Sequence, residues 1–406
     1  MVFRRKNKGI SPGTIAWRRF TRNPLSVISL FVIAGSVLVA FFVYLLVPDP
    51  SPYCNHQFLE LETKKPGFSV TMLRIARNQE VVPAGIFRRI LTGTPSPWQM
   101  IPLNRYWFDN DRIHVEEFNE AASDEPFIRD ILLPDVVYPL KYDADVVYHN
   151  DSVSFTDIYD RTKIMAVKDL REIIQRDHII RKRFLLGTDR FGRDLLSRLL
   201  LGTRVSLSVG FISVLISLLI GVSLGALAGY FRGIIDKIIM WIINVVWSIP
   251  TLLMVIAITL ALGKGFWQIF IAVGLTMWVE VARIVRGQVL SAREKEYVEA
   301  ARALGFGHFR ILFRHILPNV ISPVIIISAA NFASAILIEA GLSFLGIGVQ
   351  PPVPSWGNMI KDHYGYIIVD KAYLAILPGL AIMIMVLAFT LAGNGLRDAL
   401  DTREVS

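Results

Sequence analysis

Long apolar stretches alternate with polar segments along the chain, and this pattern predicts the main elements. Six stretches are apolar over about 20 residues, the length that crosses a bilayer as a helix. They lie at Leu25–Val47, Val205–Phe231, Ile238–Leu262, Phe266–Ile284, Val320–Ala340 and Tyr373–Ala392. We therefore expect an all-α polytopic membrane protein with six transmembrane helices. A chain that is 53% hydrophobic, with positive mean hydropathy, agrees with this class.

Basic residues are concentrated on one side of the expected topology. Seven lysines and arginines precede the first apolar stretch, and seven more lie between Arg283 and His315. On the other face, Lys264 is in the loop between the third and fourth stretches, and Lys361 and Lys371 are in the loop between the fifth and sixth. Cytoplasmic loops carry such an excess, so we expect both termini and the 283–315 segment in the cytoplasm. The first apolar stretch is too long for a signal peptide and no small-x-small site ends it, which predicts an uncleaved anchor.

The long polar segment 48–187 then lies outside the cell. It holds 18 lysines and arginines against 21 aspartates and glutamates, whereas the rest of the chain holds 25 against 13. A nucleic-acid-binding surface needs a basic soluble part, so the net charge of +9 reflects membrane topology instead. We expect three parts: an N-terminus with the first helix (1–47), an extracytoplasmic insertion (48–187) and a five-helix core (188–406).

The insertion is long enough for a small domain, with mixed α/β structure expected. Short alternating runs at Asp145–Tyr148 and Val153–Phe155 predict strands, and the apolar spacing in Lys168–Arg183 predicts a helix. Its aromatic residues could contact a ligand, but packing is the commoner use of such residues. After the insertion, Leu195, Leu196 and Leu199 share one helical face, as in a helix at the outer membrane surface.

A short polar hairpin interrupts the apolar pattern between the fourth and fifth stretches. Good helix formers fill Tyr297–Leu304, and Gly305 is suited to end that helix in a left-handed conformation. A second short helix, His308–His315, is expected to run until Pro318 breaks it.

Two carboxylates, Glu280 and Glu339, fall within or at the ends of apolar stretches, where desolvation makes ionisable groups costly. Arg283 lies one turn after Glu280, so an ion pair between them is the ordinary explanation, with a translocation role as the alternative. Glu339 is expected near the outer end of its helix, within reach of water. Pro250 and Pro323 interrupt helical hydrogen bonding and are either gating hinges or fixed kinks.

The sequence lacks the motifs for ATP binding and for metal binding. No Gly-x-x-x-x-Gly-Lys-Ser/Thr sequence is present to hold ATP phosphates, the single cysteine is Cys54, and the seven histidines include no i,i+4 pair. We therefore expect no catalytic residue, no metal site and no cofactor on this chain. Energy for any transport must come from a partner.

The hairpin Glu299-Ala300-Ala301, Gly305 and Leu317-Pro318 resembles the EAA loop (about 285–318) of ABC-importer permeases. Gly187–Asp194, Gly202–Leu207, Ala340–Gly357 and Leu396–Asp401 resemble the C-type permeases of oligopeptide, dipeptide and nickel importers. This resemblance implies a type I importer core in the bacterial inner (plasma) membrane. The implied partners are a second permease, two cytoplasmic ATPases that use ATP and Mg, and an extracytoplasmic binding protein.

The resemblance also implies which residues couple this chain to an ATPase: Glu299, Ala300, Ala301, Gly305, His315, Leu317 and Pro318. The generic motif has Ile where this chain has His315, and the outer segment is longer than is usual in the family. The expected function is a non-enzymatic permease subunit that translocates oligo- or dipeptides. The alternatives are a permease for nickel or another small solute, a secondary transporter, and a membrane-anchored enzyme or receptor that acts through residues 48–187.

Overall fold

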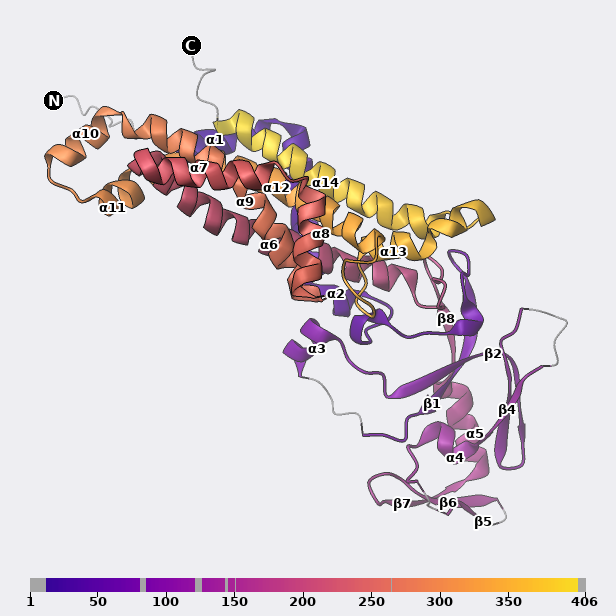
Figure 1. Cartoon of the computed structure of the whole chain (residues 1–406). Helices are drawn as coiled ribbons and strands as arrows, with labels where there is room; N and C mark the ends of the chain where they lie inside the picture. Colours follow the sequence, from indigo (N-terminus) through magenta and orange to yellow (C-terminus); the bar gives the residue numbers. More distant parts are fainter. Residues whose placement is uncertain are drawn as a thin grey trace, which may run out of the picture. The chain divides into compact units, whose positions relative to one another are not determined.

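The computed structural model describes residues 12–80, 85–120, 126–142, 145–149, 151–263 and 265–400 (Figure 1). The basic residues Arg4, Arg5, Lys6, Lys8 and Lys264 and the motif residue Asp401 lie outside these ranges. The chain forms two compact units. The helical unit comprises residues 1–40, 202–361 and 375–406, and the sheet unit comprises residues 41–201 and 362–374.

Five helices of the described chain are long and apolar enough to cross a membrane, and a bent pair makes six if it counts as one crossing. The five are α2 (Pro24–Leu46), α6 (Leu195–Phe231), α9 (Phe266–Arg293), α12 (Leu317–Phe344, preceded by a continuous helical turn from His308) and α14 (Tyr373–Leu400). The bent pair is α7 (Gly233–Trp247) and α8 (Thr251–Leu262). Shorter helices are α1 (Pro12–Arg22), α10 (Glu296–Ala303), α11 (His308–Ile311) and α13 (Trp356–His363), with one 3₁₀ segment at Tyr364–Val369.

The stretch Ile238–Leu262 is interrupted at Pro250, as expected, but the interruption divides it into two helices and is larger than a kink within one helix. Its two halves meet at 92°, with Pro250 between them in an extended conformation (φ −55°, ψ 124°). Proline cannot donate the amide that would continue α7, and it disfavours helical geometry in the preceding residue. The Pro250 carbonyl instead accepts the first hydrogen bond of α8, from the Met254 amide at 3.1 Å.

Two further boundaries differ from the sequence prediction. The amphipathic segment at Leu195 is the first turn of the continuous 37-residue α6, not a separate surface helix. Pro318 does not break the chain either, because a π-helical turn, Leu312–Ile316, joins α11 to α12 and places Pro318 in the first turn of α12. First-turn amides have no partner within a helix, so proline is tolerated there. Pro323 lies inside α12, as expected.

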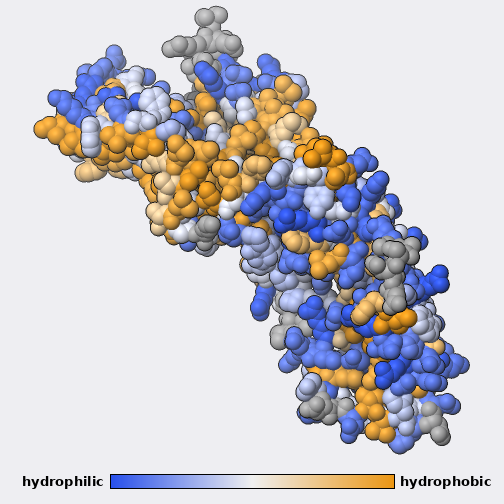
Figure 2. Space-filling view, turned by 45° about the vertical axis from the view of Figure 1, so that its right-hand side comes forward, coloured by the Kyte–Doolittle hydropathy of each residue, from blue (hydrophilic) through white to orange (hydrophobic). Residues whose placement is uncertain are grey.

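Helix α9 is central to the helical unit and packs against α7, α8 and α12. Its contact with α6 is close because glycines recur every fourth residue on the facing side of α6. A Cβ atom on Gly225 would lie 2.4 Å from the Ala282 carbonyl oxygen, and Gly221 and Gly229 are similarly crowded. Small residues allow such backbone approach in membrane helices. Hydrophobic residues also cover much of the outside of the helical unit (Figure 2).

The sheet unit contains two antiparallel sheets. The five-stranded sheet has the order β4-β3-β2-β1-β8, and the three-stranded sheet has the order β5-β6-β7. The strands are β1 (Ser69–Ala76), β2 (Trp98–Asp109), β3 (Arg112–Glu117), β4 (Ile128–Leu132), β5 (Val147–His149), β6 (Ser152–Thr156), β7 (Thr162–Ala166) and β8 (Ile179–Arg183). The helices are α3 (Ile86–Thr92), α4 (Leu133–Val137) and α5 (Val167–Ile173), with 3₁₀ turns at Pro52–Cys54 and Leu59–Leu61 and a π turn at Ile174–His178.

One buried core joins both sheets through α4 and α5. Leu73 and Ile113 from the larger sheet, Phe155 from the smaller one, Val136 from α4 and Leu170 from α5 belong to the same cluster. The alternating apolar positions of β6 supply Val153 and Phe155 to this core. Burial of apolar area from both sheets stabilises the unit as a single body.

The predicted helix over Lys168–Arg183 is correct only in its first half. After the π turn, residues Ile179–Arg183 form β8, and Ile180 pairs with Met72 of β1. The consecutive β-branched residues Ile179 and Ile180 suit a strand, and the edge of β1 supplies the hydrogen-bonding partner. Of the two predicted strands, Val153–Phe155 lies within β6, while the one at Asp145–Tyr148 begins later, at Val147.

Candidate functional site

The polar hairpin is built from α10 and α11 and is anchored to the helical core from one side. Val298 and Ala301 of α10 and Ile311 of α11 are buried together with Val285 and Val289 of α9. The Gly305 amide donates to the Arg302 carbonyl at 2.9 Å, and the Phe306 amide donates to the Ala301 carbonyl at 3.1 Å. This is a Schellman cap, which needs a left-handed residue at Gly305, whose φ is +75°.

The opposite side of the hairpin is exposed and mixed in character. Glu299 and Ala300 face outward from α10. The side chains of Leu304, Phe309 and Phe313 are 72%, 65% and 62% exposed, and the two phenylalanine rings stack on each other. Large exposed apolar side chains of this kind mark a surface that another molecule, a protein or lipid, would cover.

The remaining residues of the predicted coupling loop lie around the second half of the hairpin. His315 is half-buried and its ring stacks on Phe306, 5.7 Å between centroids. Leu317 is half-buried and Pro318 is exposed, both at the start of α12. The seven predicted loop residues therefore lie along the hairpin and the start of α12, and Ala301 and Leu317 are the two that pack against the core.

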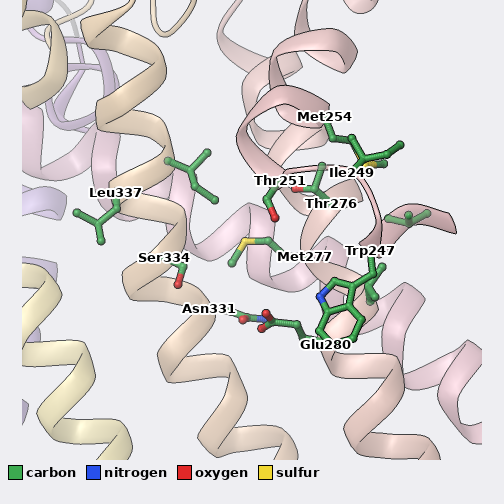
Figure 3. Close-up of a pocket in the computed structure, with 13 residues that line it drawn as sticks. Trp247, Ile249, Thr251, Met254, Thr276, Met277, Glu280, Asn331, Ser334 and Leu337 are labelled. Carbon is green, nitrogen blue, oxygen red and sulfur yellow. The ribbon is translucent and has the colours of Figure 1, made fainter. Parts of the chain in front are cut away.

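A cavity of about 360 Å³ lies in the helical unit at the break between α7 and α8 (Figure 3). Its lining comes from α7, the break, α8, α9 and α12. The lining residues are Val246, Trp247, Ile249, Thr251, Met254, Thr276, Met277, Val279, Glu280, Asn331, Ser334, Leu337 and Ile338. Glu280 is the only ionisable residue among them. Pro250, at the break itself, is exposed.

The expected ion pair between Glu280 and Arg283 is wrong. Arg283 instead donates to the Asn244 side-chain oxygen at 3.1 Å and lies over the Trp247 ring, 3.4 Å from its centroid. Asn244 and Trp247 lie one turn apart on α7, so the guanidinium of Arg283 contacts that helix and not Glu280. Glu280 is left exposed on the cavity side of α9.

The expected access of water to Glu339 is also wrong. Its side chain is completely buried in α12. Ser343 donates to one of its carboxylate oxygens at 2.6 Å, and the same hydroxyl accepts the Val349 amide at 3.2 Å. The loop that follows α12 folds back over this end of the helix and shields it. Glu339 therefore holds that loop in place and does not line the cavity.

Sequence reasoning missed the cavity residues contributed by α7, α8 and α12. One signal was present: Asn331 is an amide within an apolar stretch, where polar groups are rare. The exposed Leu304, Phe309 and Phe313 were also missed, because an apolar residue in a short helix gives no indication of which side it faces.

Two family models match the sequence. Residues 221–405 match the "binding-protein-dependent transport system inner membrane component" model, and residues 11–66 match the "N-terminal TM domain of oligopeptide transport permease C" model. The glutathione transport system permease protein GsiD of Pectobacterium atrosepticum is 44% identical over 218 residues, which is 54% of this chain and 72% of the relative.

The di/tripeptide transport system permease protein DppC of Pseudomonas aeruginosa is 44% identical over 222 residues, or 54% of this chain and 73% of the relative. Among solved structures, an inward-facing MetNI methionine ABC transporter aligns with a TM-score of 0.43 at 19% identity, over 51% of this chain and 98% of that one.

Proposed function

The chain belongs to the binding-protein-dependent transport inner-membrane components, as an ABC-importer permease of the peptide type, and we propose that it translocates oligo- or dipeptides. It is a multi-pass inner-membrane transport subunit and not an enzyme. Its relatives are named for glutathione and for di- and tripeptides, which favours a short peptide over nickel as the substrate.

Members of this family work with ATPase and substrate-binding proteins. For this chain we propose a specific assembly: a second, related permease, two cytoplasmic ATPases and one extracytoplasmic binding protein. In this assembly the α7–α8 pair counts as one crossing, which gives six, and both termini and the hairpin lie in the cytoplasm. The cluster of basic residues between Arg283 and Arg314 supports this orientation.

The single observation that carries the proposal is the two-sided hairpin. Its inner side, Val298 and Ala301, is fixed to α9 and α12 through a common core, so a push on the hairpin moves the membrane helices. Its exposed residues include Glu299 and Ala300 of α10, which on this proposal enter a cleft on an ATPase, and Leu304, Phe309 and Phe313 are exposed in the same segment. ATP binding would then close the ATPases and turn the helices between two orientations. ATP and Mg would be bound by those partners.

The test is uptake by vesicles that contain the complete transporter. We expect accumulation of a short peptide only with ATP inside, the ATPases present and the loaded binding protein outside. Radioactive nickel is the competing substrate, added under the same conditions. Uptake of nickel in place of peptide would contradict the substrate, and uptake without any ATPase would contradict the importer mechanism.

A further inference from the structure

The cavity at the α7–α8 break contains a carboxylate that has no cation beside it. Glu280 lies 14 residues into α9, about 20 Å along the helix from Phe266. A carboxylate at such depth cannot face lipid without a large desolvation cost. Because Arg283 is engaged by Asn244 and Trp247, Glu280 must face water or a ligand on the cavity side.

Asn331 of α12 lines the same cavity and adds a donor. Its side chain is only 2% exposed, and its amide nitrogen has no hydrogen-bond partner in the structure. A buried donor left unpaired is costly, so this amide is available to pair with water or with a ligand in the cavity. Figure 3 shows Asn331 and Glu280 pointing into the cavity from different helices.

The backbone at the cavity is also irregular. The backbone leaves the helical conformation at Pro250, between α7 and α8, within a bent pair that is apolar enough to cross a membrane. Non-helical backbone at membrane depth is tolerated where it is buried in protein or lines a water-filled space. In other transporters, broken helices of this kind form the substrate site.

The other walls of the cavity are flexible and apolar, so they can accommodate side chains of different shapes. Met254 and Met277 are flexible and polarisable, and Leu337 and Ile338 add apolar surface. A cavity of about 360 Å³ falls within the range of small-ligand sites. One charged group, one amide donor and soft walls suit a ligand with a fixed cationic end and variable side chains.

We propose that this cavity is a peptide-binding subsite of the translocation pathway. The Glu280 carboxylate pairs with the α-ammonium group of the peptide, and the Asn331 amide donates to its first carbonyl oxygen. This assignment rests on the proposed peptide transport. It goes further in that the pathway would select peptides with a free amino terminus. A metal ion is not the ligand, because the cavity offers a single carboxylate and neither histidine nor cysteine.

The experiment uses the complete transporter in lipid nanodiscs, without nucleotide, and one introduced cysteine. The native Cys54 is fully buried and is replaced by serine. Ser334→Cys places an exposed thiol in the cavity wall, and its alkylation rate is measured with trialanine or with N-acetyl-trialanine. We expect trialanine to protect the thiol at about tenfold lower concentration, since only its ammonium forms a charge-assisted hydrogen bond with Glu280.

Three variants separate the roles. Glu280→Gln should remove the preference for the free amine, so that both peptides protect equally. Asn331→Ala should weaken protection by both peptides and keep the preference. Glu339→Gln is the matched control. It also replaces a glutamate by glutamine, but Glu339 does not line the cavity, so the preference for the free amine should be unchanged.

Equal protection by the two peptides in the unsubstituted protein would overturn the ammonium subsite, and no protection by either would overturn the cavity as part of the pathway. Loss of the second permease from the Glu280→Gln complex would also overturn it, since Glu280 would then serve assembly. ATP-driven peptide uptake is measured on the same preparations. Intact uptake with a failed protection test refutes this subsite alone, whereas absent uptake refutes the proposed function.

Discussion

The guanidinium of Arg283 lies 3.4 Å from the centroid of the ring of Trp247, the last residue of α7. Arg283 therefore links α9 to the end of α7, where the Asn244 side chain accepts its second contact. The pair fixes the wall of the cavity beside Glu280. It does so without neutralising that carboxylate.

Double-mutant cycles should reproduce this arrangement. Arg283→Gln and Trp247→Leu should be coupled by about 1 kcal/mol, the size of a partly desolvated cation–π contact. Arg283→Gln and Glu280→Gln should be additive within about 0.5 kcal/mol. Thermal unfolding of the detergent-solubilised protein measures both. Arg286→Gln with Asp236→Asn is the positive control, because those side chains form two hydrogen bonds at 2.5 and 2.7 Å. Coupling between Glu280 and Arg283 of the same size would contradict the structure.

The structure of the hairpin predicts that alanine substitution at Gly305 and at Gly307 will have different effects on uptake. An added Cβ meets nothing within 4 Å at either Gly305 or Gly307, but only Gly305 has a positive φ, +75°. Gly305→Ala should therefore disturb the turn by about 1 kcal/mol and lower ATP-dependent uptake, while Gly307→Ala should leave uptake unchanged. Uptake by vesicles with the complete transporter is the measurement. Equal effects of the two substitutions would show that the left-handed turn has no part in coupling.

Charge reversal on the outer side of the hairpin tests docking directly. Glu299→Lys changes an exposed side chain, so the fold should persist while uptake and the stimulation of ATP hydrolysis by the loaded binding protein fall at least about tenfold. Glu296→Lys, on the first turn of the same helix, is the control for a general charge effect. Uptake near the unsubstituted level in Glu299→Lys would remove Glu299 from the coupling surface.

Accessibility to a membrane-impermeant thiol reagent tests the orientation. In a Cys54→Ser background, Tyr159→Cys in the sheet unit should be labelled on intact cells, because its side chain is 52% exposed. Lys295→Cys, next to the hairpin, should be labelled only after the membrane is opened. The opposite pattern would invert the proposed topology.

The pH dependence of the sheet unit should reflect His178. This side chain is buried, and its Nδ1 lies 2.7 Å from the Arg74 carbonyl oxygen. Burial lowers its pKa below the ordinary 6.5. The unfolded chain then binds more protons as the solution is acidified, so stability is full above about pH 6.5 and falls as the pH drops toward the folded-state pKa. Amide exchange of β1 and β8 at several pH values measures this, and His178→Gln should abolish the dependence. Protection that rises on acidification would contradict the assignment.

Much of the helical unit followed from the sequence, for a simple reason. A bilayer demands about 20 apolar residues per crossing, and this demand is local in the chain, so α2, α9, α12 and α14 could be located directly. The first half of the hairpin was also predictable, since Gly305 and the helix formers before it act within a few residues, whereas the expected break at Pro318 was wrong. The basic residues also act locally, and the side of the membrane that they indicate stays a prediction.

Tertiary structure decided what depends on neighbours distant in sequence. Residues 179–183 form a strand because β1 offers an unpaired edge about 110 residues earlier, although their apolar spacing also fits a helix. Arg283 contacts Trp247 and not the predicted partner Glu280, because α7 packs against α9. Glu339 became buried because the chain after α12 folds back over it. Local sequence encodes periodicity and charge, but the partner that a side chain finds is set by packing between segments, and that packing left Glu280 and Asn331 facing one cavity.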